Sequence, residues 1–306
     1  FLFKTRKALF DSGVFSSDKP EVPVIVVGNL NVGGTGKTPL TLYLANALSK
    51  AGKKVGIATR GYKGKKSNSM PYILDETSDA QDYGDEAVYL SRHSNAIVCV
   101  CSQRLKAANL LFERGVDVIL SDDGLQHFAL KRDLELVVVS SDRAFGNRRL
   151  LPAGPLREGL DRLDTIDLIC LNGKKIDEDL HLENTIGFEI ENKTVKNIHN
   201  DQIRSIDAFI NHDVNLIAGI GDPNVLIQKL IKLGININHI KVADHGAIDS
   251  SEIKNLQGTS LFLTPKDLVK YSRDDLPKET WELIPEMMID QSQEQSMMNK
   301  IFEIIQ

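Results

Sequence analysis

The stretch VIVVGNLNVGGTGKTPLTLYLANAL, residues 24–48, carries the residue types that bind and transfer a phosphoryl group. Its glycines permit a tight turn in which bare backbone N–H groups and the amino end of the following helix face an anion. The ammonium of Lys37 would reach the β- and γ-phosphates of a nucleotide, and the hydroxyl of Thr38 would ligate magnesium. We therefore predict a nucleotide-binding loop made of Asn31, Val32, Gly33, Gly34, Thr35, Gly36, Lys37 and Thr38.

The loop departs from the pattern G-x-x-x-x-G-K-[ST] at its first position, where this chain has Asn31. Asparagine tolerates a positive φ better than most residues, so we expect Asn31 to replace glycine in that conformation. Val32 stands where some ATPases with a related GGxGKT loop carry a lysine, which disfavours the dimer-sandwich ATPases. The sequence has no NKxD motif for guanine, so ATP is preferred over GTP.

Two acidic pairs could hold magnesium and take part in the transfer. Asp122 and Asp123 follow an apolar run in VDVILSDDG, and an aspartate at the end of a neighbouring strand binds the magnesium of many such loops. Asp85 and Glu86 begin a helix in YGDEAVYL. Taken alone, either pair could instead cap a helix or complement its dipole.

Alternating strands and helices must position these groups. Near-continuous apolar strands separated by helices imply a parallel sheet that is covered on both faces. Strands are predicted at 22–29, 53–62, 96–102, 116–124, 134–142 and 165–172, with helices at 37–52, 83–94 and 104–115. A strand, turn and helix at 214–235 and a strand and turn at 260–271 indicate a second unit.

The predicted fold class is α/β, with a P-loop NTPase-type parallel sheet domain and a smaller second α/β domain joined by a short β linker. We assign an arm to 1–17, the P-loop kinase domain to 18–182, the linker to 183–203 and the second domain to 204–306. Within the linker, TIGFEIENKTVKNI (185–198) is expected to form a short hairpin-like pair of strands.

The composition excludes several classes of protein. A net charge of −5 over 306 residues leaves no dominant basic field, which argues against a general nucleic-acid binder. No run of 18 apolar residues is present, so no segment of the sequence is predicted to span a bilayer. Cys99, Cys101 and Cys170 lie in apolar runs and are interpreted as reduced core residues of a cytosolic compartment.

The arm, FLFKTRKALFDSGVF, has the pattern of an amphipathic helix. Its apolar residues would share one helical face: Leu2, Phe3, Leu9, Phe10 and Val14. Two interpretations stay open, a terminal helix packed on its own domain and an anchor that lies in a membrane interface. Because the sequence starts at Phe1 rather than Met, the arm can extend upstream of it.

Five segments in close succession resemble the tetraacyldisaccharide 4′-kinases of lipid A biosynthesis. They are VGNLNVGGTGKTP, TRGYKG, GDEAVYL, SDDGLQHFALKRDLELVVV and RAFGNRRLLPAGPLREGLDRL. The resemblance is dense from residue 23 to about 165 and thins to GIGDP and DHG beyond. It implies transfer of the γ-phosphoryl of ATP to the 4′-hydroxyl of an acylated glucosamine disaccharide 1-phosphate. The amphipathic arm then favours a membrane surface, the cytoplasmic face of the bacterial inner membrane.

The resemblance also implies a role for each matching residue. Asp85 takes the proton of the sugar hydroxyl with His245 as its partner, Lys37 is catalytic, and Thr38, Glu86 and Asp122 hold Mg²⁺. The implied substrate-binding residues are Arg60, Tyr62, Asp123, Gln126, His127 and Arg157. The family usually shows two adjacent histidines, whereas this chain has Gly246 after His245. The implied partners are ATP, Mg²⁺, the lipid A disaccharide 1-phosphate precursor and the membrane surface, with no nucleic acid and no protein partner.

Two alternatives differ in the class of protein. The chain could be another P-loop kinase or NTPase, acting on a different hydroxyl or as a metallochaperone, or it could be a nucleotide switch that barely turns over. GIGDP suggests a dinucleotide site, but Asp222 and Pro223 fit an N-cap and a first helical residue more simply. The arm and the RGY and RRLLPAGPLRE segments favour the lipid kinase, because a soluble GTPase would not need them.

Overall fold

The computed structural model describes residues 2–66, 69–173, 184–242, 246–249, 252–253, 255–256 and 258–305. The strands in chain order are β1 (Val24–Gly28), β2 (Val55–Thr59), β3 (Tyr72–Ile73), β4 (Ile97–Val100), β5 (Val118–Asp122), β6 (Leu134–Ser140), β7 (Leu168–Asn172), β8 (Thr185–Asn197), β9 (Ile203–Ser205), β10 (Asp213–Ile217), β11 (Asn236–Ile240), β12 (Ser260–Leu263) and β13 (Thr280–Ile289). The helices are α1 (Leu2–Asp11), α2 (Lys37–Lys50), α3 (Ala80–Tyr83), α4 (Asp85–His93), α5 (Arg104–Glu113), α6 (Pro223–Lys232), α8 (Pro265–Leu268) and α9 (Gln291–Ile305), with 3-10 turns η1 (Leu160–Thr165), η2 (Ile206–Phe209) and η3 (Arg273–Asp275).

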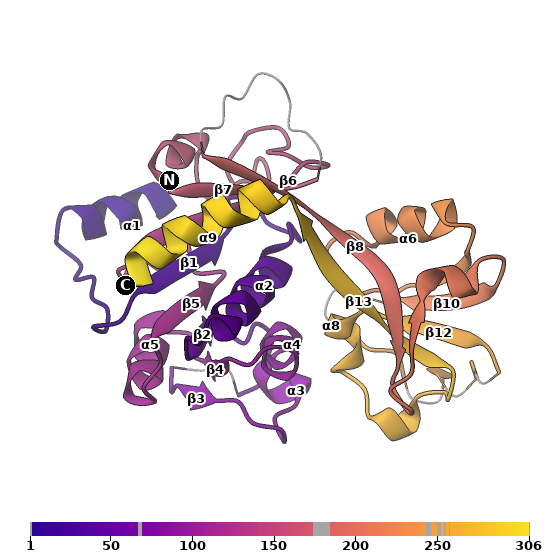
Figure 1. Cartoon of the computed structure of the whole chain (residues 1–306). Coiled ribbons are helices and arrows are strands. Elements are labelled where there is room, and N and C mark those ends of the chain that lie inside the picture. The colour runs from indigo at the N-terminus through magenta and orange to yellow at the C-terminus, as the bar shows by residue number, and fades with distance from the viewer. Residues whose placement is uncertain are drawn as a thin grey trace.

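The chain folds into two lobes that lie side by side and are joined by the long strands β8 and β13 (Figure 1). The first lobe contains β1 to β7, and the second lobe contains β10 to β12. Among the described residues, one sheet runs through both lobes in the order β11-β10-β12-β13-β8-β7-β6-β1-β5-β2-β4-β3, with β9 beside β8. The predicted α/β class is confirmed.

The parallel sheet of the first lobe brings the phosphate loop and the aspartate pair to one edge. Strand β1 lies between β5 and β6 and is parallel to both. Val27 at the end of β1 pairs with Asp122 at the end of β5. Because the carboxyl ends of parallel strands meet at one edge, the two motifs become neighbours although about ninety residues separate them in sequence.

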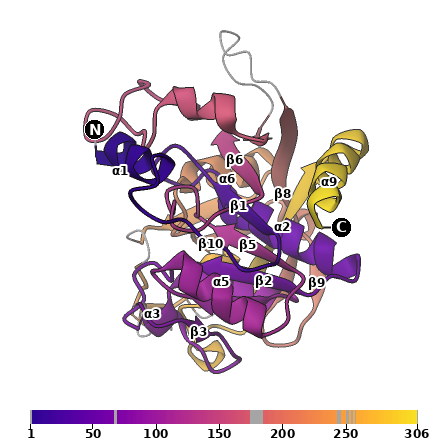
Figure 2. The ribbon, with the colours of Figure 1, turned by 90° about the vertical axis from the view of Figure 1, so that its left-hand side faces the viewer.

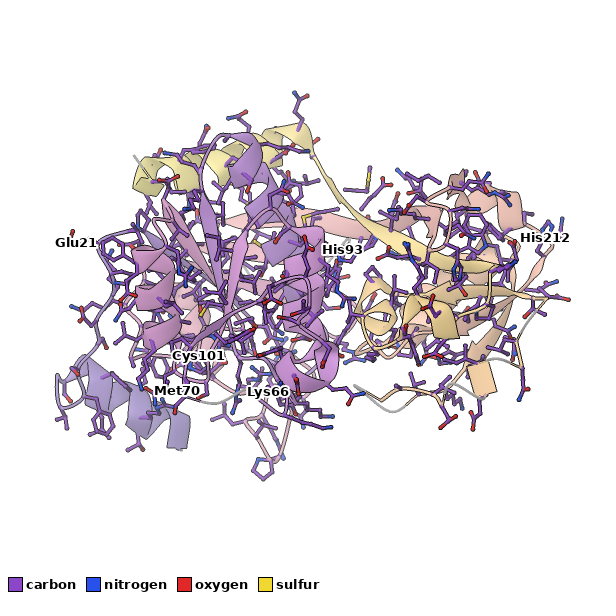
Figure 3. The ribbon with its side chains drawn as sticks, turned by 90° about the horizontal axis from the view of Figure 1, so that it is seen from below. Glu21, Lys66, Met70, His93, Cys101 and His212 are labelled. Carbon is purple, nitrogen blue, oxygen red and sulfur yellow. The ribbon has the colours of Figure 1, made fainter. Side chains whose placement is uncertain are left out.

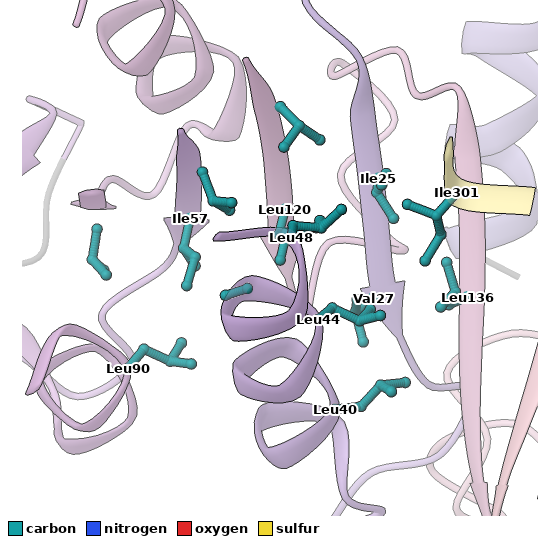
Figure 4. Close-up of a cluster of buried hydrophobic side chains, with 14 of the residues drawn as sticks. Ile25, Val27, Leu40, Leu44, Leu48, Ile57, Leu90, Leu120, Leu136 and Ile301 are labelled. Carbon is teal, nitrogen blue, oxygen red and sulfur yellow. The ribbon is translucent and has the colours of Figure 1, made fainter. Parts of the chain in front are cut away.

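Helices cover both faces of this sheet, as the apolar strands predict. Leu40, Leu44 and Leu48 of α2 are spaced by four residues and pack against Ile25 and Val27 of β1 (Figure 4). Each such leucine contributes roughly 1.5–3 kcal/mol by leaving water. The opposite side chains of the sheet form a separate cluster with α5. This packing fixes the strand ends from which the site is built.

The predicted hairpin at 185–198 is wrong, because these residues form a single strand. β8 runs unbroken from Thr185 to Asn197, parallel to β7 at its start and antiparallel to β13 along its length. Phe188 belongs to the core of the first lobe and Val195 to the core of the second. The residues between them cross from one core to the other and are polar for that reason, a pattern that imitates a turn in sequence.

The last helix belongs to the first lobe, which corrects the predicted extent of the second domain, 204–306. Met297, Ile301 and Ile305 of α9 are buried with Ile25 and Leu136 of the first-lobe sheet (Figure 4). Figure 2 shows α9 on the opposite side of the sheet from α1. The chain therefore returns through β13 to the lobe in which it began. The linker boundaries at 183–203 stay a prediction.

The arm is partly tied to the first lobe. The ring of Phe10 lies 6.0 Å from that of Phe128 and 5.3 Å from that of Phe15. Helix α1 ends at Asp11, so Val14 lies beyond the helix on which it was expected. Val14 and Phe15 are 66% and 45% exposed. The arm thus combines a packed side chain with an exposed apolar end.

Two further expectations concern cysteines and membrane spans. Cys99, Cys101 and Cys170 are buried and reduced, as the sequence predicts. In the part of the chain that the structure describes, none of the helices has both the length and the apolarity to cross a bilayer.

Candidate active site

The phosphate loop leaves β1 at Gly28 and enters α2 at Lys37. Gly33 and Gly36 adopt φ values of 107° and 100°, in the left-handed region that only glycine occupies without strain. Gly36 is the N-cap of α2 and has no side chain to cap it, so the first N–H groups of the helix stay available for an anion. The local geometry is that of a phosphate-binding turn.

Asn31 has a different role from the one expected. It is not among the described residues with positive φ, and its amide donates to the carbonyl of Ala144 at 2.6 Å. Asn29 instead lies inside the loop, where its amide donates to the carbonyl of Gly33 and to the Thr35 hydroxyl. The loop is therefore held from two sides by asparagine amides, and its first position does not require glycine.

Asp122 lies beside the loop in a buried, negatively charged environment. Its side chain is 1% exposed and accepts a hydrogen bond from the Thr41 hydroxyl at 2.9 Å. Burial, followed by the nearby carboxylates of Glu86 and Asp123, raises the pKa of Asp122 to about 7. A divalent cation would relieve that repulsion, so the donor set suits the predicted Mg²⁺ site.

Asp123 serves a different purpose from its neighbour. Lys37 Nζ lies 3.7 Å from Asp123 Oδ1, and Arg157 Nη1 donates to Oδ1 and Oδ2 at 3.0 and 3.1 Å. Burial pushes the pKa of Asp123 upward, but Lys37 and Arg157 more than offset it, so the pKa lies below its usual value. Asp123 therefore links the loop lysine to an arginine of the substrate-binding set.

Two buried charged residues contact the predicted site residues, and the sequence does not predict them. Glu158 is buried and accepts from Gln126 at 2.7 Å, while Gln126 Oε1 accepts from Arg157 at 3.3 Å. Arg104 is buried and donates to the carbonyls of Cys101 and Asp122. Burial lowers the pKa of Arg104 to about 10, so it stays a cation behind the aspartate pair. Only its place just after a strand could have pointed to Arg104.

The predicted acceptor side of the site lies next to the arm. Burial and then the charge of Arg104 lower the pKa of His127 to about 3, so its imidazole is neutral at physiological pH. The charges of Arg60 and Arg6 lower the pKa of His127 further. Arg60 and Tyr62 are exposed. The ring of Phe10 in the arm lies 6.0 Å from the ring of Phe128, the residue after His127, so the arm lies beside this part of the predicted substrate-binding set.

The second lobe reaches the acidic pair of α4. Lys266 Nζ lies 3.3 Å from Glu86 Oε1, and Lys270 Nζ lies 3.7 Å from Asp85 Oδ2. His245, the expected partner of Asp85, lies outside the described residues. At the other end of α4, His93 contacts Glu282 of β13 at 2.7 Å, and Figure 3 shows His93 on the side of the first lobe that faces the second.

The turn between β10 and α6 touches the phosphate loop directly. Arg143 Nη2 donates to the carbonyl of Gly221 and to Asp222 Oδ2, both at 2.9 Å. Gly221 lies so close to Gly34 that a Cβ added to Gly221 would be 2.4 Å from the Gly34 nitrogen. Asp222 caps α6, and Pro223 is its first residue, as predicted. GIGDP is thus a contact to the loop and not a separate dinucleotide site.

The described residues contain no cluster of three His, Cys, Asp or Glu side chains that could hold a metal by themselves. The predicted Mg²⁺ set has two carboxylates, Glu86 and Asp122, and the hydroxyl of Thr38. That composition fits a magnesium ion carried by a nucleotide, which takes its other ligands from phosphates and water.

Comparison with known proteins places this geometry in context. The family model for tetraacyldisaccharide-1-P 4′-kinase matches residues 1–303. The tetraacyldisaccharide 4′-kinase of Aliivibrio fischeri strain ES114 is 37% identical, over 99% of this chain and 92% of that protein. The one from Tolumonas auensis is 38% identical over 92% and 83%. The crystal structure of LpxK from Aquifex aeolicus in complex with ATP is 28% identical, with a TM-score of 0.81 over 100% of this chain and 95% of that one.

Proposed function

The chain belongs to the tetraacyldisaccharide 4′-kinase family, and from this premise we propose how its site works. It transfers the γ-phosphoryl group of ATP to the 4′-hydroxyl of a tetraacyl glucosamine disaccharide 1-phosphate, a step of lipid A biosynthesis. The observation that carries the proposal is the pairing of Val27 with Asp122, which sets the loop and the acidic pair Asp122–Asp123 at one edge of the sheet.

The loop and its lysine bind and polarise the nucleotide. The N–H groups at the start of α2 receive the phosphates, and Lys37 balances the charge that spreads over the transferred group. Thr38, Glu86 and Asp122 would hold Mg²⁺, which neutralises charge on the β- and γ-phosphates when bound. Asp123 forms ion pairs with both Lys37 and Arg157 and so fixes the position of each side chain relative to the other.

Asp85 orients the acceptor hydroxyl and takes its proton. The bond between the γ-phosphorus and the β,γ-bridging oxygen breaks, a bond from phosphorus to the 4′-oxygen forms, and the proton passes to Asp85. Because the transition state is loose, the proton moves late and orientation is the main contribution. His245 is proposed as the partner of Asp85 from the second lobe.

A lipid-dependence assay tests the reaction. ADP formation by the full chain is measured with and without the acylated disaccharide 1-phosphate in detergent micelles. We expect ADP and phosphorylated lipid in equal amounts, and little ADP without the lipid. Lipid-independent hydrolysis would instead support an NTPase, and tight ATP binding without turnover would support a nucleotide switch.

The membrane surface is the second part of the proposal. The acceptor is lipid-borne, Phe10 of the arm lies against Phe128 next to His127, and Val14 and Phe15 expose apolar surface at the end of the arm. Such a segment binds an interface by apolar burial and by attraction of its basic residues to anionic lipid. The cytoplasmic face of the inner membrane is the location that this proposal implies.

Vesicle sedimentation tests that location. Val14→Asp/Phe15→Asp changes two exposed side chains and should weaken binding to anionic vesicles about tenfold or more, because each buried apolar side chain contributes ~1.5–3 kcal/mol. ATP binding should not change. Ile203→Asp, at an exposed apolar residue of β9, is the matched control. If both variants bind vesicles as well as the parent protein does, the arm is only structural.

A further inference from the structure

The second lobe presents two lysines to the two carboxylates of α4. Lys266 and Lys270 are four residues apart, at the start of α8 and just after its end. Lys266 Nζ lies 3.3 Å from Glu86 Oε1 and 3.9 Å from Asp85 Oδ2. Lys270 Nζ lies 3.7 Å from the same Oδ2 of Asp85. Each of the two carboxylates, Asp85 and Glu86, therefore lies within 4 Å of a lysine ammonium from the second lobe.

Lys270 is fixed within its own lobe before it reaches Asp85. Its ammonium lies 2.7 Å from Asp267 Oδ1 and donates to the carbonyl of Gly246 at 3.1 Å. Asp267 is 0% exposed, and its Oδ2 accepts from the backbone N–H of Gly219 at 2.8 Å and from the Thr264 hydroxyl. A chain of contacts therefore runs from the end of β10 through Asp267 and Lys270 to Asp85.

Burial makes this contact stronger than an ordinary surface ion pair. The side chains of Lys270 and Asp85 are 7% and 4% exposed, so water screens their attraction poorly. At 3.7 Å the pair exceeds hydrogen-bond length, so Lys270 attracts the carboxylate by charge alone. A lysine held by Asp267 and Gly246 cannot follow Asp85 if the carboxylate turns, so it defines one preferred position.

We propose that Lys270, braced by Asp267, is a positioning residue that holds the Asp85 carboxylate where it meets the acceptor hydroxyl. Lys266 steadies Glu86 in the same way. The inference rests on the proposed function, because it gives the second lobe a part in the same reaction. It also means that the base is correctly placed only when the two lobes are together, since both lysines come from the second lobe.

The test uses the full chain with ATP and the acylated disaccharide 1-phosphate. Lys270→Met should lower kcat about 100-fold, because a reacting group misplaced by about 1 Å costs on that scale. The KM values for ATP and for the lipid should stay within about threefold of those of the parent. Lys270→Arg, which restores the charge, should recover most of the loss. Asp267→Asn keeps the bond to Gly219 but loosens Lys270, so it should give a smaller fall in kcat. Lys196→Met, which removes a surface ion pair with Asp201 in the second lobe, should leave kcat unchanged.

A double variant separates positioning from a general loss of structure. If Lys270 acts through Asp85, then Lys270→Met adds nothing to the loss already caused by Asp85→Asn. Multiplied losses, or a kcat for Lys270→Met within threefold of the parent, would overturn the positioning role. If Lys270→Met fails to fold, Asp267→Asn and Lys270→Arg decide the question, and a parental kcat in Asp267→Asn overturns the role. If the parent protein itself shows no lipid-dependent transfer, the proposed function is overturned. If the parent transfers phosphate but the Lys270 variants behave like it, only the positioning role is overturned.

Discussion

The two lobes contribute to one site by different means. In the first lobe, Lys37, Asp122 and Arg104 lie at the ends of neighbouring strands or at the starts of the following helices, supported by the cores on the two faces of one sheet. In the second lobe, Gly221, Lys266 and Lys270 reach the site only through contacts across the gap that β8 and β13 span (Figure 1). The first-lobe residues are therefore held in place by the first lobe alone. The position of the second-lobe residues relative to the site depends on the contacts between the two lobes.

This difference predicts how variants divide. Changes in the first lobe should abolish the chemistry, because they remove charges that the transition state needs. Changes in the second lobe should lower kcat by up to about 100-fold and leave nucleotide affinity intact, because they disturb the placement of the reacting groups.

Lys37→Ala should cause the largest loss. Its ammonium is the loop charge that balances the transferred phosphoryl group, and removing one such preorganised charge costs about 10²–10³ in rate or more. Single-turnover transfer from ATP to the lipid acceptor measures the chemical step directly. Transfer within about tenfold of the parent would show that this loop is not the catalytic phosphate site.

Asp85→Asn should lower kcat by about 10²-fold or more with little change in ATP affinity, because a positioned base contributes on that scale. His245→Ala should do the same if it is the partner of Asp85. The double variant should then be little worse than the worse single variant, since the two residues act as a unit. Fully multiplied losses would mean that they act independently, and a near-normal kcat for His245→Ala would return that residue to a structural role.

Gly221→Ala tests the contact between the second lobe and the loop. A methyl group there would meet the Gly34 nitrogen at 2.4 Å, so the turn must move away from the loop. Overpacking of this kind costs ~1–3 kcal/mol. The strain is relieved when the turn leaves the loop, so we expect kcat/KM to fall by about five- to 150-fold. Gly187→Ala, whose added Cβ meets only a side-chain oxygen at 3.5 Å, is the control. Equal kcat/KM values for the two variants would show that the close approach is not needed.

Asp122 should make the nucleotide-free protein less stable as the pH rises. Its pKa of about 7 lies above the ordinary value of 3.8 for an aspartate, so its contribution to stability is present below about pH 4 and is lost as the pH rises through 7. Asp122→Asn removes this dependence and should stabilise the protein at pH 8 by at most ~4 kcal/mol, at ~1.4 kcal/mol per pKa unit. Urea unfolding between pH 5 and 8 measures the difference. A difference that stays constant over this range would contradict the buried, repelled carboxylate.

The same division explains what the sequence could predict. The loop is recognisable because it is a short motif that directly follows an apolar strand. Asp122 is recognisable because it ends another apolar strand. Glu158 and Arg104 are not, because only the fold brings them to Gln126 and to the Asp122 carbonyl. The expectation that Asn31 replaces glycine in a positive-φ conformation is wrong. Its side-chain amide instead donates a hydrogen bond to the carbonyl of Ala144.

The errors at the fold level have the same origin. The polar middle of β8 suggests a turn because it lies between two cores, and the sequence does not reveal that one strand enters both of them. The position of α9 at the end of the chain suggests the second domain, but its apolar face packs on the core of the first lobe. Lys266 and Lys270 occur in TPKDLVK without any recognisable motif, and only the meeting of the lobes gives them partners.

Analysis of the reaction product tests the central claim most directly. The parent protein is incubated with ATP and the acylated disaccharide 1-phosphate, and the lipid product is examined by ³¹P NMR. The account predicts one new phosphate monoester, on the 4′-oxygen of the distal glucosamine, in an amount equal to the ADP formed. A new phosphate on any other oxygen, or ADP without a phosphorylated lipid, would contradict it.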